Sequence, residues 1–249
     1  MFLDLLIIIM ETTTFSRFCV ILLIIAVHTV VLGQNVNPFT VRYDKDLKGD
    51  MLLIGNNIVN ANPPNTPYSG NEYNDNLSMQ YIDIDNDALT FSSSSANLTI
   101  IPKAAQCYKI AYAGLYWAGI YSQSKIDDGT VNRNDLNKVK IKLPNGAPYN
   151  DITGQLIYDG YSSPTTNGAK MPYACYADVT ALLQGLTNAN GTYTVANVIS
   201  GRGIIIGGFA SGWTLYVVYE DSLESAKSIT SFDHAETSSR KTLTSARTP

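Results

Sequence analysis

The fold class is decided by the stretch CYKIAYAGLYWAGIY, residues 107–121 of this 249-residue chain. It runs for 15 residues without a turn signal, and its aromatic and aliphatic residues, which favour strands, interleave with Ala and Gly. The stretch therefore predicts one long central strand. Gly114 or Gly119 is expected to mark a bulge in this strand or a close approach by a neighbouring strand.

Shorter runs that alternate apolar and polar residues lie on both sides of this stretch, and each predicts a further strand. They are FTVRYD from Phe39, MLLIGNNIV from Met51, SMQYIDID from Ser78, NLTII from Asn97, KVKIKL from Lys138, TYTVANVI from Thr192 and GWTLYVVYED from Gly212. One short helix is expected near residues 178–186, where Asp178 can cap the N-terminus and leucines follow at helical spacing. The pattern predicts an all-β fold, an antiparallel β-sandwich of jelly-roll type.

Residues 1–33 are expected to be a secretory signal peptide. An apolar run from Phe18 to Gly33 follows the cation Arg17 and ends in a small residue, which is typical of such a signal. Met10 is the more ordinary start, and cleavage is expected between Gly33 and Gln34. The run of 16 residues is short for a membrane-spanning helix, which needs about 20, but an uncleaved membrane anchor is the alternative.

The expected domain organisation is a β-sandwich over residues 34–233 and a tail over residues 234–249. The tail HAETSSRKTLTSARTP has no alternation and no aromatic residue, so we expect it to be disordered or an aberrant, truncated or frame-shifted remnant of a longer protein. The signal predicts a Sec-exported protein that is secreted or held at the cell surface, with periplasmic retention if the chain is truncated.

Three cysteines occur, and Cys19 would leave with the signal. Cys107 and Cys175 remain, and in an oxidising compartment an even number of cysteines favours a disulfide. A bridge between them would stabilise the fold by about 4 kcal/mol in the chain-entropy model. Two buried free thiols in separate strands are the alternative.

The expected body lacks the residues that many chemistries need. Between Gln34 and Asp233 there are 13 Lys or Arg and 18 Asp or Glu, with no basic stripe, so no nucleic-acid partner is expected. The only histidines are His28 and His234, outside the body, which removes Ser–His and Cys–His nucleophiles and histidine-bound zinc or copper. No phosphate-binding fingerprint occurs, and neither a haem nor a nucleotide is expected.

Clustered acids make calcium the one cofactor worth considering, although none is required. On a strand, Asp83, Asp85 and Asp87 would share one face, with Ile82 and Ile84 pointing into the core. Calcium prefers such carboxylates, but the EF-hand pattern fails because Ala88 and Ser94 replace its Gly and Glu. A second candidate site contains Asp127 and Asp128. We expect solvated acidic rows at both places, with calcium as the alternative.

Paired acids are also the only route to an enzyme that the sequence offers, since two carboxylates suffice for a glycosidase. The pairs are Asp83 with Asp85, Asp127 with Asp128, and Glu220 with Asp221. Adjacent residues on a strand point to opposite faces, and no acid is shown to lie in a cleft. We therefore expect no enzymatic activity, with a polysaccharide-active enzyme as the alternative.

Aromatic side chains suggest a second kind of site, because such rings stack on sugars. The candidates are Trp117, Tyr116, Tyr121, Tyr158 and Tyr161. Trp117 and Trp213 lie in apolar strands and are expected in the core. Tyr158 and Tyr161 occur in IYDGYSSPTTNG, which is expected to form an exposed loop, and are the candidate ligand-binding residues.

Five phrases occur in the order YAGLYWAGIY, ITGQLIYDGY, PYACYADVTALLQ, NGTYTVANV and ASGWTLYVVYED. Together they resemble the N-terminal β-rich region of secreted, gliding-motility-associated or adhesin-like surface proteins of the Bacteroidota, which are cargo of the type IX secretion system. The resemblance runs from about Asp44 to Asp233. It implies an extracellular binding or scaffolding role, with a surface or a polysaccharide as partner, and it carries over no catalytic residue.

Overall fold

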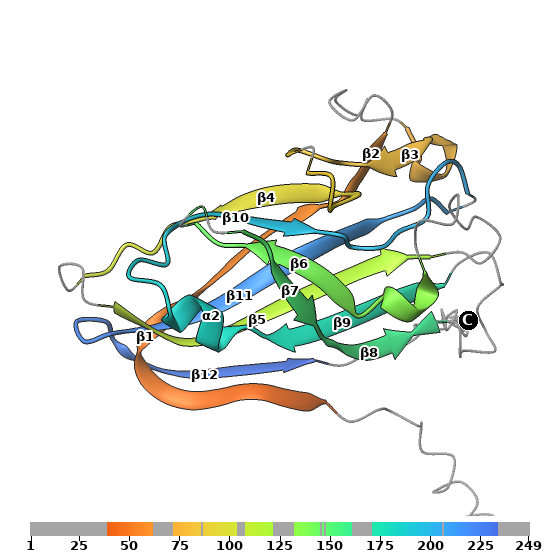
Figure 1. Cartoon of the computed structure of the whole chain (residues 1–249). Helices are drawn as coiled ribbons and strands as arrows, with labels where there is room; N and C mark the ends of the chain where they lie inside the picture. Colours follow the sequence, from red (N-terminus) through yellow and green to blue (C-terminus); the bar gives the residue numbers. More distant parts are fainter. Residues whose placement is uncertain are drawn as a thin grey trace, which may run out of the picture. The chain divides into compact units, whose positions relative to one another are not determined.

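Antiparallel strands form most of the part of the chain that the computed structural model describes (Figure 1). That part comprises residues 39–61, 72–85, 87–103, 108–121, 132–144, 146, 148–160, 171–205 and 207–233, so the predicted signal peptide and tail lie outside it. The strands are β1 (Thr40–Asn57), β2 (Val59–Ala61), β3 (Met79–Tyr81), β4 (Ser93–Leu98), β5 (Tyr108–Ile120), β6 (Lys138–Lys142), β7 (Asn150–Thr153), β8 (Gln155–Asp159), β9 (Pro172–Asp178), β10 (Gly191–Ala196), β11 (Ser211–Asp221) and β12 (Ala226–Asp233).

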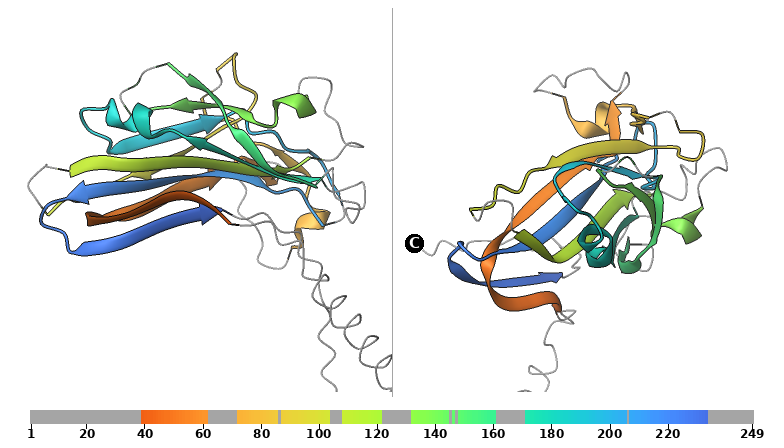
Figure 2. Two further views of the ribbon diagram at one scale, coloured as in Figure 1. Left: turned by 90° about the horizontal axis from the view of Figure 1, so that it is seen from below. Right: turned by 60° about the vertical axis from the view of Figure 1, so that its left-hand side comes forward.

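The strands pair in a nested order. β1 pairs with β11, β4 with β10, β5 with β9 and β6 with β7. Successive pairs alternate between two sheets with the orders β1-β11-β5-β9 and β4-β10-β6-β7, and β12 adds beside β1 and β8 beside β9. Two views of the sheets are given in Figure 2. This is the strand order of a jelly roll, so the predicted jelly-roll-like antiparallel β-sandwich is confirmed.

The predicted helix is also confirmed, as the short α2 (Thr180–Gln184). Its N-cap residue is Val179, and the carboxylate of Asp178 accepts a hydrogen bond from the Thr180 N–H at 2.9 Å. Asp178 therefore satisfies one of the backbone donors that a helix start leaves without a partner. Two single-turn 3-10 helices, η1 (Asn74–Asn76) and η3 (Arg133–Asp135), lie in connections.

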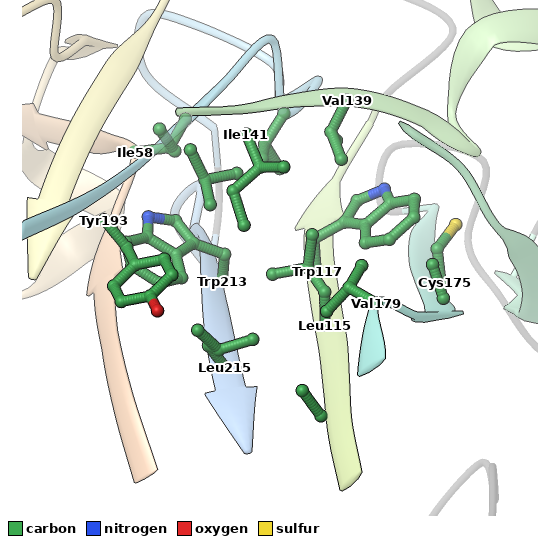
Figure 3. Close-up of a cluster of buried hydrophobic side chains, with 14 of the residues drawn as sticks. Ile58, Leu115, Trp117, Val139, Ile141, Cys175, Val179, Tyr193, Trp213 and Leu215 are labelled. Carbon is green, nitrogen blue, oxygen red and sulfur yellow. The ribbon is translucent and has the colours of Figure 1, made fainter. Parts of the chain in front are cut away.

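Side chains from both sheets meet in one hydrophobic core (Figure 3). Trp117 on β5 and Trp213 on β11 are 1% and 3% exposed, as expected for core residues. The indole N–H of Trp117 donates to the Leu136 carbonyl at 2.8 Å, and that of Trp213 donates to Ser94 Oγ at 2.9 Å. Both indoles thus bury their rings without leaving a polar group unpaired.

The central strand predicted at residues 107–121 is β5, which lies between β11 and β9. Gly114 and Gly119 mark close approaches: a Cβ at Gly119 would lie 2.6 Å from the Ile199 carbonyl oxygen, and one at Gly114 would lie 2.7 Å from the Tyr112 hydroxyl. The register shift between β5 and β11 falls elsewhere, between Val218 and Tyr219. The close-approach interpretation is therefore correct for Gly119, whereas the nearest atom to Gly114 belongs to its own strand.

The two strands predicted at Phe39 and Met51 are in fact one bent strand, β1. Its first half, Thr40–Lys48, pairs with β12, and its second half, Gly49–Asn57, pairs with β11. Figure 1 shows the strand bending between the two halves. Gly49 lies at the change of partner, and a Cβ there would lie 1.9 Å from the Tyr219 carbonyl oxygen.

The first half of β1 and β12 form a two-stranded ribbon, here called the strap, on the outer face of the larger sheet, which is the face turned away from the four-stranded sheet. The Tyr43 ring of the strap stacks on Tyr112 of β5, with ring centroids 5.1 Å apart. Ile229 of the strap is buried in the same cluster. The members of this second cluster are Tyr43, Tyr112, Tyr176, Tyr216, Val218 and Ile229. The strap therefore gives part of the sandwich a third layer.

The predicted Cys107–Cys175 disulfide is wrong. Cys175 is a free, buried thiol that donates to the Leu136 carbonyl at 3.3 Å, and burial raises the pKa of this thiol to about 12. Cys107 lies outside the described residues. Its neighbour Tyr108 begins β5, nine residues before Trp117, which pairs with Cys175. At about 3.3 Å per residue this separation is roughly 30 Å, whereas a disulfide needs Cα atoms within about 7 Å.

The close contact at Gly49 predicts the effect of a side chain at the bend. We expect Gly49→Val to lower the free energy of unfolding by about 2 kcal/mol or more, because the β1–β11 pair would have to separate. Gly185→Ala is the control, since a Cβ there meets its nearest atoms at 3.5 Å. Urea denaturation of both variants measures the difference, and a Gly49→Val variant as stable as the control would contradict the role of the bend.

Candidate functional site

The outer face of the larger sheet carries an open trough of about 800 Å³ beside the strap. Its floor is a cross-strand row of small residues: Asn57 of β1 pairs with Gly212 of β11, Gly212 with Ala118 of β5, and Ala118 with Ala174 of β9. Residues directly opposite each other in antiparallel strands share one face of the sheet. Ala118 is exposed although it lies on the central strand.

Larger side chains line the trough around this row. Leu53 of β1 is 60% exposed, and Tyr116, Ile120 and Pro172 are half-buried. None of the described residues that line the trough is charged. The trough can therefore accept an uncharged ligand without removing water from a fixed charge, whereas a charged ligand would find no counter-ion there.

The strap places a charged residue, Arg42, over Tyr176. Arg42 lies with its guanidinium 4.2 Å from the centroid of the Tyr176 ring and donates to Gln155 Oε1 at 3.1 Å. It also forms an ion pair with Asp233 at 2.6 Å. Tyr176 pairs with Tyr116, which lines the trough, so Arg42 lies at the boundary between the covered and the open parts of the face.

Of the predicted ligand-binding residues, only Tyr158 can be placed. It lies on the edge strand β8 rather than on a loop and pairs with Ala174 of the floor row, although Tyr158 is not among the residues that line the trough. Burial, and then the charge of Asp159, raise the pKa of its hydroxyl. Tyr161 lies outside the described residues. Of the other candidate rings, Trp117 and Tyr121 are buried, which leaves Tyr116 at the trough.

The predicted row of outward acids on a strand is wrong. β3 ends at Tyr81, and Asp83 and Asp85 lie in a non-strand segment. The N–H of Ile84 donates to Ser93 Oγ at 2.8 Å instead of to a neighbouring strand, and the Ile84 side chain is 52% exposed rather than in the core. Asp87 accepts the Leu89 N–H at 2.9 Å and therefore stabilises a turn.

Asp85 is held in a local network. Ser93 Oγ lies 2.9 Å from Asp85 Oδ1 and 2.8 Å from Asp83 Oδ1, and it has a single proton for the two carboxylates. Asp85 Oδ2 accepts the Tyr149 hydroxyl at 2.5 Å and lies 3.4 Å from Lys142 Nζ. Burial opposes ionisation, but the hydrogen bonds from Tyr149, Ser93, the Asp87 backbone and Lys142 together hold the pKa of Asp85 below its usual value.

The structure places only some of the acids predicted as calcium ligands or as catalytic pairs. In the described part of the chain no group of three His, Cys, Asp or Glu residues is placed to hold a metal ion. Asp127 and Asp128 lie outside it. Glu220 is exposed, whereas Asp221 is 1% exposed and accepts the N–H groups of Lys103 and Leu223. Asp221 thus has a structural role.

The trough itself was missed by sequence reasoning. Its floor residues Asn57, Gly212, Ala118 and Ala174 come from four strands that are distant in sequence. The one sequence feature that pointed to it was the alternation of Ala and Gly with bulky residues in the central strand. This alternation predicted that a neighbouring segment approaches closely, but it did not show which residues lie opposite the small ones.

Comparisons of the chain with protein-family models, with curated proteins and with solved structures found no match. No helix in the described residues is long and apolar enough to cross a membrane.

The Asp85 network predicts a pH-dependent contribution to stability. Because the folded pKa is lowered, the contribution is fully present above the ordinary carboxyl pKa of about 3.9 and is lost as the pH falls through the folded value. We expect Asp85→Asn to cost about 1–3 kcal/mol at pH 7 and the gap to the parent to shrink below about pH 4. Denaturant titrations at several pH values measure this gap.

Asp151→Asn is the matched control, since the Asp151 carboxylate is 82% exposed and pairs with Lys140 at the surface. We expect a smaller loss there, as is usual for exposed pairs. A gap for Asp85→Asn that stays constant down to pH 2 would show that its ionised form is not favoured in the fold.

Calcium at Asp83–Asp87 stays the alternative, and the hydrogen bonds that Asp85 Oδ2 accepts from Tyr149 and Lys142 count against it. We expect the melting temperature to stay the same when EGTA replaces calcium. A fall of several degrees, restored by calcium but not by magnesium, would instead establish a calcium site.

Proposed function

We propose that this chain is an exported, non-enzymatic β-sandwich module of an adhesin-like cell-surface protein, and that it binds extracellular polysaccharide through the trough. The observation that carries the proposal is an open, uncharged trough that crosses the strands of the larger sheet. Export is supported by the N-terminal sequence, and the surface role by the resemblance to gliding-motility-associated proteins.

The chemistry of the trough suits a neutral sugar polymer. Strands lie about 4.8 Å apart, so the row from Asn57 to Ala174 spans roughly 14 Å across four strands. The Ala and Gly floor leaves room for flat rings, and Tyr116 offers an aromatic surface. Asn57 and Thr214 supply polar groups for hydroxyls, in the usual pattern of an apolar site with a few polar contacts.

The proposal predicts that filling the floor abolishes binding. Ala118→Trp places a large ring on the exposed central position of the floor. We expect glycan-array signals for neutral polysaccharides to weaken about tenfold or more, and a tenfold loss of affinity corresponds to about 1.4 kcal/mol of binding free energy. Ala226→Trp is the control, because Ala226 is exposed on β12 and does not line the trough. Thermal melts establish that both variants fold.

Equal binding by the two variants would refute the trough as the site. Release of reducing sugar from a bound polymer would favour the alternative function, a carbohydrate-active enzyme, over a binding module. Binding confined to acidic polysaccharides would also count against the proposal, since the described residues of the trough carry no cation.

A further inference from the structure

The two ends of the described domain lie side by side at one end of the strap. Thr40 pairs with Asp233 and Val41 with Phe232, so the residues at which the chain enters and leaves the described domain are cross-strand neighbours. A pull that separates Phe39 from Asp233 acts first on this terminal pair. The cross-strand pairs of the strap then break one after another, starting from this terminal pair, because the force acts on one pair at a time.

Few residues of the strap are buried against the sheet beneath it, although Arg42 also contacts Tyr176 and Gln155 of that sheet. Of the 17 residues in Thr40–Lys48 and Ala226–Asp233, only Tyr43 and Ile229 are buried. The Tyr43 hydroxyl is buried with no hydrogen-bond partner in the described part of the chain, and opening would return it to water. Segments with little buried apolar surface open at a lower free energy than a core.

A second set of contacts would stop the opening at the far end of the strap. Lys227 Nζ donates to the Gly49 carbonyl at 2.9 Å and to Asp50 at 2.7 Å, and it also pairs with Glu224. Glu224 pairs with Lys103. Beyond this root cluster lies β11, whose side chains Leu215 and Val217 are fully buried, so further unzipping would expose the main core.

We propose that the strap is a force-sensitive cover: tension between Phe39 and Asp233 peels it from the outer face as far as the root cluster, while the jelly roll stays folded. Peeling uncovers Tyr112, Tyr176 and Tyr216, which are now at most 8% exposed, and so lengthens the aromatic surface beside the trough. The use of this change in adhesion rests on the proposed function, whereas the peeling itself does not.

Optical tweezers on the full chain test the proposal, with handles fused to its two ends. Opening as far as Lys227 releases residues 40–46 and 228–233, and 13 residues at about 3.5 Å each lengthen the chain by roughly 45 Å, so we expect a first, reversible step of that size before the main unfolding. A single step that unfolds the whole domain would overturn the proposal.

Two further measurements identify the strap as the source of the step. Handles at Phe39 and Glu224 load the two strands in shear, and the first step should then need a higher force or disappear. Asp233→Asn, which removes the ion pair with Arg42, should lower the force of the first step and leave the second unchanged. Asp46→Asn, an exposed position on the strap, is the control.

These outcomes are independent of ligand binding. A step of roughly 45 Å in a protein that binds no glycan would contradict the proposed function alone, and glycan binding without the step would contradict the strap alone. Equal forces in the two pulling geometries would also overturn the unzipping mechanism.

Discussion

The central strand β5 carries large side chains on both of its faces, and the domain is arranged so that both are covered. Leu115 and Trp117 point into the main core, whereas Tyr112 and Tyr116 lie on the outer face. A sandwich covers only one face of each sheet, so the outer tyrosines need a separate cover. The bend of β1 at Gly49 provides it by turning the first half of that strand back as the strap.

The cover extends over only part of the outer face, and the residue sizes change at the same place. Tyr112, Tyr176 and Tyr216 lie under the strap, while Ala118, Ala174 and Gly212 lie beyond it. Bulky residues left in the open would form an apolar patch of the kind that invites association. Small residues there leave a hollow instead, bordered by Arg42 of the strap.

The sequence predicted the features that depend on a local pattern of residues. The predictions were wrong for features that depend on contacts between residues distant in sequence. Alternation identified the central strand and the jelly-roll class, and helical spacing identified α2. The bend of β1 was missed because Gly49 is constrained by Tyr219, which lies far away in sequence. The acidic row failed because Ser93 and Tyr149 hold Asp85 outside a strand. The predicted disulfide is wrong because an even number of cysteines and an oxidising compartment say nothing about the distance between the two thiols.

The nested pairing has a consequence for how the domain is made. Both halves of β1, the first strand of the described domain, find their partners only in β11 and β12, the last two. Contacts between such distant segments form slowly, because a long loop must close before they stabilise anything. The ribosome therefore releases most of this chain before the sandwich can close. A polypeptide that remains open for so long depends on protection from aggregation until its last strand arrives.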